Sequence, residues 1–120
     1  MQSNYQKLLV WQKAMDLTED IYTITKKFPA SELYWIVSQM RRCSLSIPSN
    51  IAEGWERNSD KLHTNFLHIA KWSAAELETQ IILSQRLGFI SHHEEQKLLQ
   101  QTEEILRMLS WFISTIKKSN

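Results

Sequence analysis

The stretch SQMRRCSLSIPSNIAEG, Ser38 to Gly54, decides the fold, because it places a proline inside an otherwise strongly helical segment. Its apolar residues Met40, Ile47 and Ile51 keep the spacing of one helical face. A second face, about 180° away on a helix, is mostly polar and consists of Arg42, Ser46, Ser49 and Glu53. We therefore expect one long helix with two patterned sides, and Pro48 should kink it because proline lacks the backbone donor.

Apolar periodicity extends this helix and predicts another before it. The first helix should stop at Pro29, and its stripe is Val10, Ala14, Leu17, Ile21, Ile24 and Phe28. The second should begin at a Ser31 N-cap and run to about Arg57. Its expected stripe is Leu33, Val37, Met40, Ser44, Ile47, Ile51 and Trp55.

Two more helices follow with clear boundaries. Asn58 and Ser59 supply a turn and a cap, and Gly88 should end the third helix. The expected stripe of this helix is Leu62, Phe66, Ile69, Ser73, Leu77, Gln80, Leu83 and Leu87. Ser91 and Glu94 have the spacing of a capping box for the fourth helix. Its expected stripe is Leu98, Ile105, Leu109, Phe112 and Ile116.

The connections between these helices are only a few residues long, and the chain has two glycines and two prolines in 120 residues. Short connections force consecutive helices to lie antiparallel. No Gly-, Pro- or Ser-rich linker divides the chain. The prediction is an all-α protein, an antiparallel up-down-up-down four-helix bundle in one domain covering residues 1–120.

Composition limits where the protein acts. Cys43 is the single cysteine, so no internal disulfide can form, and a reducing compartment, the cytoplasm, is expected. The N-terminal residues lack the apolar stretch of a secretory signal. The apolar run from Leu33 to Val37 is the longest and falls well short of the roughly 20 residues that cross a bilayer. We expect a soluble protein without a membrane partner.

The outward polar face predicts self-association. Solvated helical faces favour Lys, Glu and Gln, whereas small residues let another backbone approach closely. Two large aromatics also lack a place in a monomer core, and aromatics anchor interfaces. The expected subunit interface is Trp35, Arg42, Ser46, Ser49, Asn50, Glu53 and Trp111. The alternative is an ordinary solvated surface with single exposed aromatics.

Charge gives little support to nucleic-acid binding. Fourteen Lys and Arg stand against thirteen Asp and Glu, a net charge of +1, and the signs are interspersed. Phosphate neutralisation would need cations gathered on one surface. A ring of copies could still repeat a modest basic patch. The candidate residues are Lys26, Lys27, Arg41, Arg57, Lys61 and Lys71.

No catalytic or metal-binding pattern is found, and neither an enzyme nor a cofactor is expected. The Glu-x-x-His segments of di-metal bundles do not occur, and His63 and His68 fall on different helical faces. Cys43 has no histidine in pattern to activate it. Ser44, Ser73, Glu76 and Gln80 interrupt the inner faces. They should fix the bundle register by hydrogen bonds, and a contact of Arg41 or Arg42 with Glu76 or Asp16 is a hypothesis.

Three segments together resemble one known family. They are LLVWQKAMDL at 8–17, FPASELYWIVSQMRRCSLSIPSNIAEG at 28–54 and FLHIAKWSAAELETQIILSQRLGFI at 66–90. The SIPSNIAEG and AAELETQ strings are the specific part. The chain resembles the small bacterial four-helix-bundle proteins encoded in intervening sequences of 23S ribosomal RNA genes. It departs from the family at Trp72, where members often have a small residue.

The resemblance implies a ring-like homopentamer. A similar protein, the accessory protein of diversity-generating retroelements, partners a reverse transcriptase and binds nucleic acid through a basic surface. We therefore expect a non-enzymatic homo-oligomeric scaffold or adaptor. Light scattering would measure the mass of the oligomer. The alternative is an accessory protein that binds RNA, such as ribosomal RNA, or DNA through basic patches repeated around the oligomer.

Overall fold

The computed structural model describes residues 4–118, which form four long α-helices and contain no strand. The helices are α1 (Leu9–Thr25), α2 (Ser38–Trp55), α3 (Asp60–Arg86) and α4 (His92–Lys118). Three short turns accompany them, namely η1 (Asn4–Lys7), η2 (Ala30–Glu32) and the π-helical turn η3 (Leu33–Val37). The four-helix prediction is confirmed.

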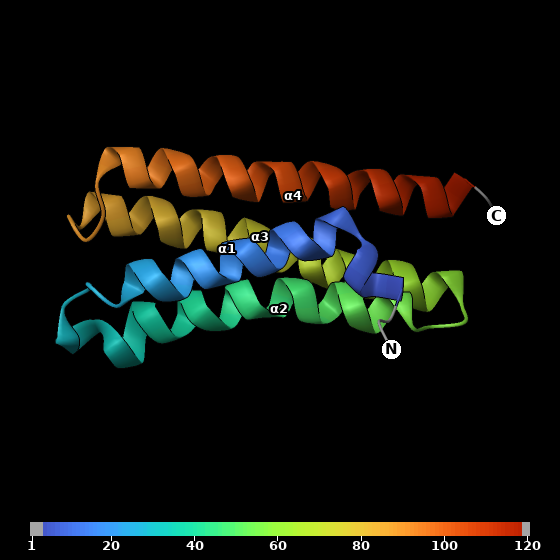
Figure 1. Cartoon of the computed structure of the whole chain (residues 1–120), viewed down its shortest axis with the longest axis horizontal. Helices are drawn as coiled ribbons and strands as arrows, with labels where there is room; N and C mark the ends of the chain where they lie inside the picture. The colour runs from blue at the N-terminus through green and yellow to red at the C-terminus, as the bar shows by residue number, and fades with distance from the viewer. Residues whose placement is uncertain (1–3, 119–120) are drawn as a thin grey trace.

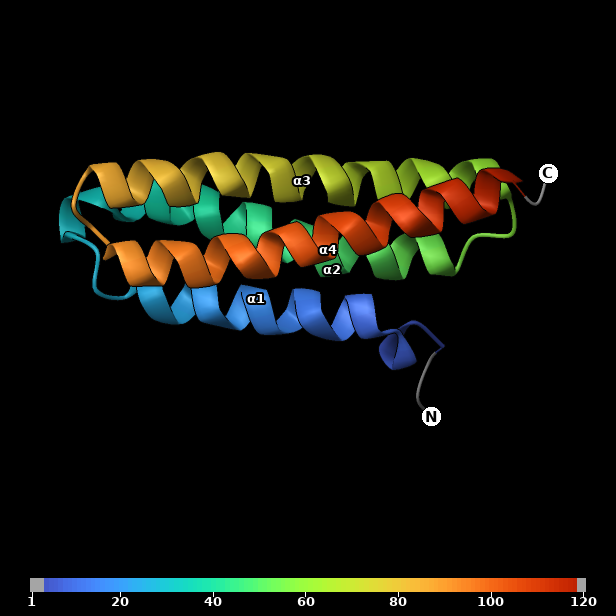
Figure 2. The ribbon, with the colours of Figure 1, turned by 90° about the horizontal axis from the view of Figure 1, so that it is seen from above.

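The helices run alternately along the long axis of the molecule (Figure 1). The helix pairs that pack are α1 with α2, α2 with α3, α3 with α4, and α1 with α4. This leaves α2 and α4 on the diagonal, and Figure 1 shows them along opposite edges of the bundle. In the second view α3 and α1 form the other two edges (Figure 2). None of the described helices is long and apolar enough to cross a membrane.

The core lies along the bundle axis and follows most of the predicted stripes. Every residue predicted for the first helix is buried or half-buried, and so is every one predicted for the fourth. In α2, Met40, Ser44, Ile47 and Ile51 are fully buried. Leu33 is an exception, because it lies in η3, before α2, and is 45% exposed.

The stripe predicted for α3 is wrong. The buried face of this helix is Thr64, Leu67, Ala70, Ala74, Leu77, Ile81 and Ser84. Of the predicted stripe only Leu77 is buried, while Leu62, Ile69, Leu83 and Leu87 are exposed. The physical reason is steric. Ala70 and Ala74 allow α3 to approach its neighbours closely, Leu67, Leu77 and Ile81 fill the remaining space, and the competing apolar side is left outside.

The helix ends follow local capping chemistry with one correction. Ser59 Oγ accepts a hydrogen bond from the Leu62 amide, and Ser91 and Glu94 bond each other's amides as a capping box. Gly88 has φ of +80°, a conformation that favours glycine after a helix. Ser31 is not an N-cap, because it lies inside η2. The chain enters α2 through successive 3-10 and π turns instead.

Pro48 lies buried inside α2, which continues as one helix from Ser38 to Trp55. The expected kink there stays a prediction, and the non-helical backbone of this region is at Trp35, with φ −114° and ψ −105°. Proline has no N–H for the carbonyl of Ser44. Thr18 Oγ1 of α1 lies 2.9 Å from that carbonyl oxygen and 2.8 Å from the Ala14 carbonyl. The α1–α2 contact therefore supplies the donor that proline lacks.

Replacing Thr18 with valine tests this contact. Thr18→Val leaves the buried Ser44 carbonyl without its side-chain donor, so we expect the free energy of unfolding to fall by about 1–3 kcal/mol. Pro48→Ala restores a backbone donor, so Thr18→Val should cost less than half as much in that background. Urea unfolding of the four proteins, followed by circular dichroism, gives the coupling energy. Equal costs in both backgrounds would contradict the assignment.

Candidate functional site

The polar face of α2 is divided between the interior of the chain and its surface. Ser46 Oγ lies 2.8 Å from Ser73 Oγ of α3. The Asn50 side-chain amide donates to both the carbonyl and the hydroxyl of Ser46. Ser46 and Asn50 are half-buried, whereas Arg42 and Ser49 are exposed. Part of the face expected to point outward is thus used to join α2 to α3.

Glu53 has a partner just after the end of α2. Its carboxylate pairs with the guanidinium of Arg57, four residues on. That guanidinium lies over the Phe66 ring, 5.0 Å from the centroid. Exposed pairs of this kind contribute about 0.3–0.5 kcal/mol. Glu53 and Arg57 thus neutralise each other on the surface. Glu53 therefore has a counter-charge within its own chain before any second copy binds.

The two candidate tryptophans lie on different sides of the molecule. Trp35 belongs to η3, which leads into α2, and its side chain is 72% exposed. Trp111 belongs to α4 and is 61% exposed, with its ring edge-on to Phe112 at 5.1 Å. Because α2 and α4 are diagonal, the structure does not bring these tryptophans into one patch.

An apolar surface on α3 was missed by sequence reasoning. It consists of exposed apolar residues whose spacing along the chain follows the helical repeat, so they lie on one side of the helix. This α3 outer face is Leu62, Ile69, Trp72, Leu83 and Leu87. The sequence did carry a signal for it. The spacing of Ala70, Ala74, Leu77, Ile81 and Ser84 is equally helical and leaves the larger residues outside.

A polar cluster joins α2 to α3 beside this face. The Cys43 thiol donates to the Glu76 carboxylate, and the Gln80 amide lies 3.5 Å from Cys43 Sγ. Burial raises the pKa of Cys43 to about 11, and the bond to Glu76 adds to the rise. The cysteine is therefore a neutral thiol at physiological pH. Its role in the structure is that of a packing residue and a hydrogen-bond donor.

The proposed arginine contact is not formed within residues 4–118. Arg41 Nε donates to Thr25 Oγ1 at 3.0 Å, and its guanidinium lies 4.9 Å from the centre of the Tyr22 ring. The hydrogen-bond partner of Glu76 is Cys43. Arg41 is half-buried between α1 and α2 because its donor is satisfied there. It is correspondingly poorly placed to contact a partner's phosphate.

The remaining basic candidates are spread over both ends of the bundle. Lys26 and Lys27 lie just after α1, and Lys27 pairs with Glu94. Arg57 and Lys61 lie at the α2–α3 turn, at the opposite end of the long axis (Figure 1). Lys71 lines a separate hollow with lysines of α4. The six candidates therefore do not make one basic patch on a single copy.

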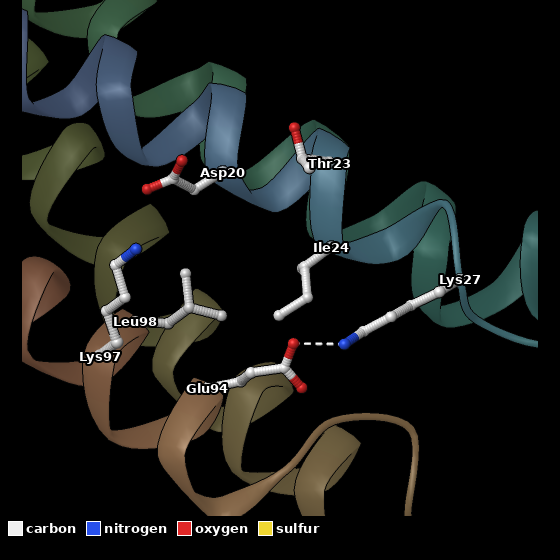
Figure 3. Close-up of a pocket in the computed structure, with 7 residues that line it drawn as sticks. All are labelled: Asp20, Thr23, Ile24, Lys27, Glu94, Lys97 and Leu98. Carbon is white, nitrogen blue, oxygen red and sulfur yellow. Dashed lines mark hydrogen bonds and ion pairs between the residues drawn. The ribbon is translucent and has the colours of Figure 1, made fainter.

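A hollow of about 260 Å³ lies between α1 and α4 (Figure 3). Ile24 and Leu98 form its apolar part, and the charged groups at its edge are Asp20, Lys27, Glu94 and Lys97. The hydrogen bond from Lys27, followed by that from the Ser91 amide, lowers the pKa of Glu94. Opposite charges are already paired across this hollow. Asp20 accepts a hydrogen bond from the Gln101 side chain, and no activated nucleophile is among the lining residues.

The histidines make ring contacts instead of gathering around a metal. His63 meets the Trp55 ring edge-on at 4.7 Å, and burial lowers the pKa of His63. His68 stacks on Trp72 with centroids 6.0 Å apart. His92 Nδ1 lies 3.3 Å from a Glu95 carboxylate oxygen. Over the described part of the chain, no three His, Cys, Asp or Glu residues form a group that could hold a metal ion.

Comparison with known proteins gives a family and similar solved structures. A family model described as "23S rRNA-intervening sequence protein" matches residues 6–111. The fold is similar to a crystal structure of a protein with unknown function from the S23 ribosomal protein family of Bacteroides thetaiotaomicron VPI-5482. That likeness has a TM-score of 0.80 at 24% identity and covers 88% of this chain and 98% of the other. The comparison with curated proteins gave no match.

The state of Cys43 can be checked by alkylation. With a pKa of about 11, about a thousandth of the folded thiol is ionised at pH 8, against about a quarter for an ordinary cysteine. We expect iodoacetamide to label native Cys43 more than tenfold slower than an exposed thiol. The control is Glu19→Cys in a Cys43→Ser background, at an exposed position of α1 outside the proposed interface. Equal rates for the two proteins would refute the buried, hydrogen-bonded thiol.

Proposed function

This chain belongs to the 23S rRNA-intervening sequence protein family, and on that basis we propose that it acts as a non-enzymatic, homo-oligomeric scaffold or adaptor. The proposed assembly is a pentamer in the cytoplasm. Pentamer formation is the expectation that the family resemblance raised. The location follows from a single cysteine and the absence of a disulfide.

The α3 outer face is the observation that carries the proposal. Its exposed fractions are 47% for Leu62, 38% for Ile69, 66% for Trp72, 46% for Leu83 and 51% for Leu87. These side chains lie on one side of α3, with the exposed Glu76 between Trp72 and Leu83, and exposed apolar side chains gathered on one side of a helix favour an interaction site. Fully burying one large apolar side chain contributes about 1.5–3 kcal/mol. A second copy that covers this face would gain that energy at several positions at once.

The placement of the aromatics favours a ring over a twofold dimer. A twofold dimer uses one self-complementary patch, whereas a ring uses two different patches on each subunit. One patch here is the α3 outer face together with the exposed α2 residues Arg42 and Ser49. The other patch is centred on Trp111 of α4, the helix diagonal to α2. We propose that the first patch of one subunit packs against the Trp111 patch of the next.

The alternative function is RNA or DNA binding through the six basic candidates. Lys27 and Arg57 already have acidic partners, and Arg41 is half-buried. The net charge of +1 gives no long-range attraction to phosphate. Binding to structured RNA with a steep salt dependence would support this alternative. No affinity at low salt would leave the scaffold as the better account.

A matched pair of isoleucines tests the interface. Ile69 and Ile82 are both on α3 and are 38% and 37% exposed, but Ile82 borders α4. Ile69→Asp places a charge in the proposed contact, so it should dissociate the assembly to a 14.2 kDa chain. Ile82→Asp should leave the assembly intact. Light scattering measures the mass, and circular dichroism confirms that both variants are folded. Dissociation by both or by neither would contradict the interface.

A mixing experiment tests the ring geometry. Ile69→Asp and Trp111→Asp each remove a different patch, and each variant alone should be monomeric. In an equimolar mixture one intact pair of patches remains, so a heterodimer of about 28 kDa should form from two 14.2 kDa chains. The ring cannot close, because the second contact would bring together the two patches that carry the introduced aspartates. A mixture that stays monomeric, with both variants folded, would refute the head-to-tail arrangement.

A further inference from the structure

A second hollow, of about 390 Å³, lies between α3 and α4 near the end of α4. Lys71 reaches it from α3, and Lys117 and Lys118 reach it from the last turn of α4. Its other lining residues are Ser110, Ile113 and Ser114. We call it the lysine hollow. Three ammonium groups and two hydroxyls therefore border one space, and no carboxylate is among the lining residues.

The lysine hollow differs from the three cations of the described residues that pair with a carboxylate, because several cations converge on it. Lys13 lies 3.0 Å from Glu104, Lys27 pairs with Glu94, and Arg57 pairs with Glu53. Within residues 4–118 none of the three lysines of the hollow has an acidic partner. Like charges held close together repel each other unless a counter-charge is present. The arrangement lacks an anion of its own.

The helix dipole accounts for only part of this arrangement. Lysines in the last turn of a helix interact favourably with its exposed carbonyls. That reason applies to Lys117 and Lys118, which end α4. It does not apply to Lys71, which lies in the middle of α3. The convergence of Lys71 on the α4 lysines therefore needs another explanation.

An aromatic pair lies at the edge of the same charge cluster. Burial lowers the pKa of His68, and the nearby charges of Lys117 and Lys71 lower it further. The field of these ammonium groups therefore reaches the imidazole. His68 in turn stacks on Trp72, whose indole is 66% exposed. The cations thus meet a neutral ring and an exposed ring on one surface.

We propose that the lysine hollow binds clustered phosphate oxyanions, of the kind that a triphosphate chain or a nucleic-acid backbone presents. Three converging cations match a ligand with several negative charges better than a single carboxylate. Lysine ammonium groups and serine hydroxyls both donate hydrogen bonds to phosphate oxygens. The site uses only Lys71 of the six basic candidates. Lys71 is next to Trp72 and Ser110 is next to Trp111, so the hollow borders both proposed interface patches, and its ligand goes beyond the scaffold role.

Calorimetric titration with inorganic triphosphate at low salt tests the site. The wild-type chain should bind, and Lys71→Gln/Lys117→Gln should bind at least tenfold more weakly. The matched control is Lys26→Gln/Lys61→Gln, which loses the same two charges elsewhere and should retain wild-type affinity. Equal affinities of the two double variants, or no binding by the wild type, would overturn the proposal.

The resonances of His68 provide a readout that a general loss of charge would not reproduce. Triphosphate beside Lys71 and Lys117 should raise the pKa of His68, measured by NMR, because it cancels their field. The Lys71→Gln/Lys117→Gln variant should show a raised pKa without ligand and no further change with it. An unchanged His68 pKa on saturation of the wild type would place the anion elsewhere and refute the site.

A third arm separates the two sources of phosphate. A single-stranded uridine oligonucleotide without a terminal phosphate replaces triphosphate, and the same variants are compared. If Lys71→Gln/Lys117→Gln weakens binding of the oligonucleotide and the control variant does not, the hollow binds a nucleic-acid backbone. If Lys71→Gln/Lys117→Gln weakens binding of triphosphate but not of the oligonucleotide, the hollow binds a free polyphosphate. The titrations are repeated on Ile69→Asp, which should be monomeric. Binding by this variant would show that the hollow binds phosphate whether or not the chain assembles.

Discussion

The close approach of α2 to α3 is the constraint on which the rest of the structure depends. A Cβ added at Gly54 would lie 2.9 Å from the Phe66 Cβ, so only glycine fits there. Ser46 and Ser73 meet through their hydroxyls along the same contact. At this spacing the inner side of α3 alternates small residues, such as Ala70 and Ala74, with Leu67, Leu77 and Ile81, which fill the core. With this face in the core, the second apolar side of α3, which includes Leu62, Trp72 and Leu83, faces outward, where a monomer leaves it in water.

Most of the fold could be predicted from the sequence, because the apolar stripes of α1 and α4 are unambiguous and the caps at Ser59 and Ser91 have short-range causes. The register of α3 could not, since two helical faces compete there and a preference for large residues selects the wrong one. The entry into α2 was also missed. The π-helical turn containing Trp35 has no local sequence signal comparable to a cap, and Ser31 suggested one falsely.

The candidate sites divide in the same way. Ser73 and Glu76 were expected to bond within the bundle, and they bond Ser46 and Cys43 of α2, although Glu76 is exposed and does not lie on the inner face. Which surface residues stand together depends on the arrangement of helices in space, which periodicity along one helix does not contain. The separation of Trp35 from Trp111 and the convergence of Lys71 on Lys117 both required the bundle itself.

The central claim is that the α3 outer face is covered by a second copy of the chain. Sedimentation equilibrium of the wild-type protein at micromolar concentration tests it most directly. The account predicts a single species of about 71 kDa, five times the 14.2 kDa chain. A folded species of about 14 kDa across the whole concentration range would contradict the account, because Leu62, Trp72 and Leu83 would then remain in water.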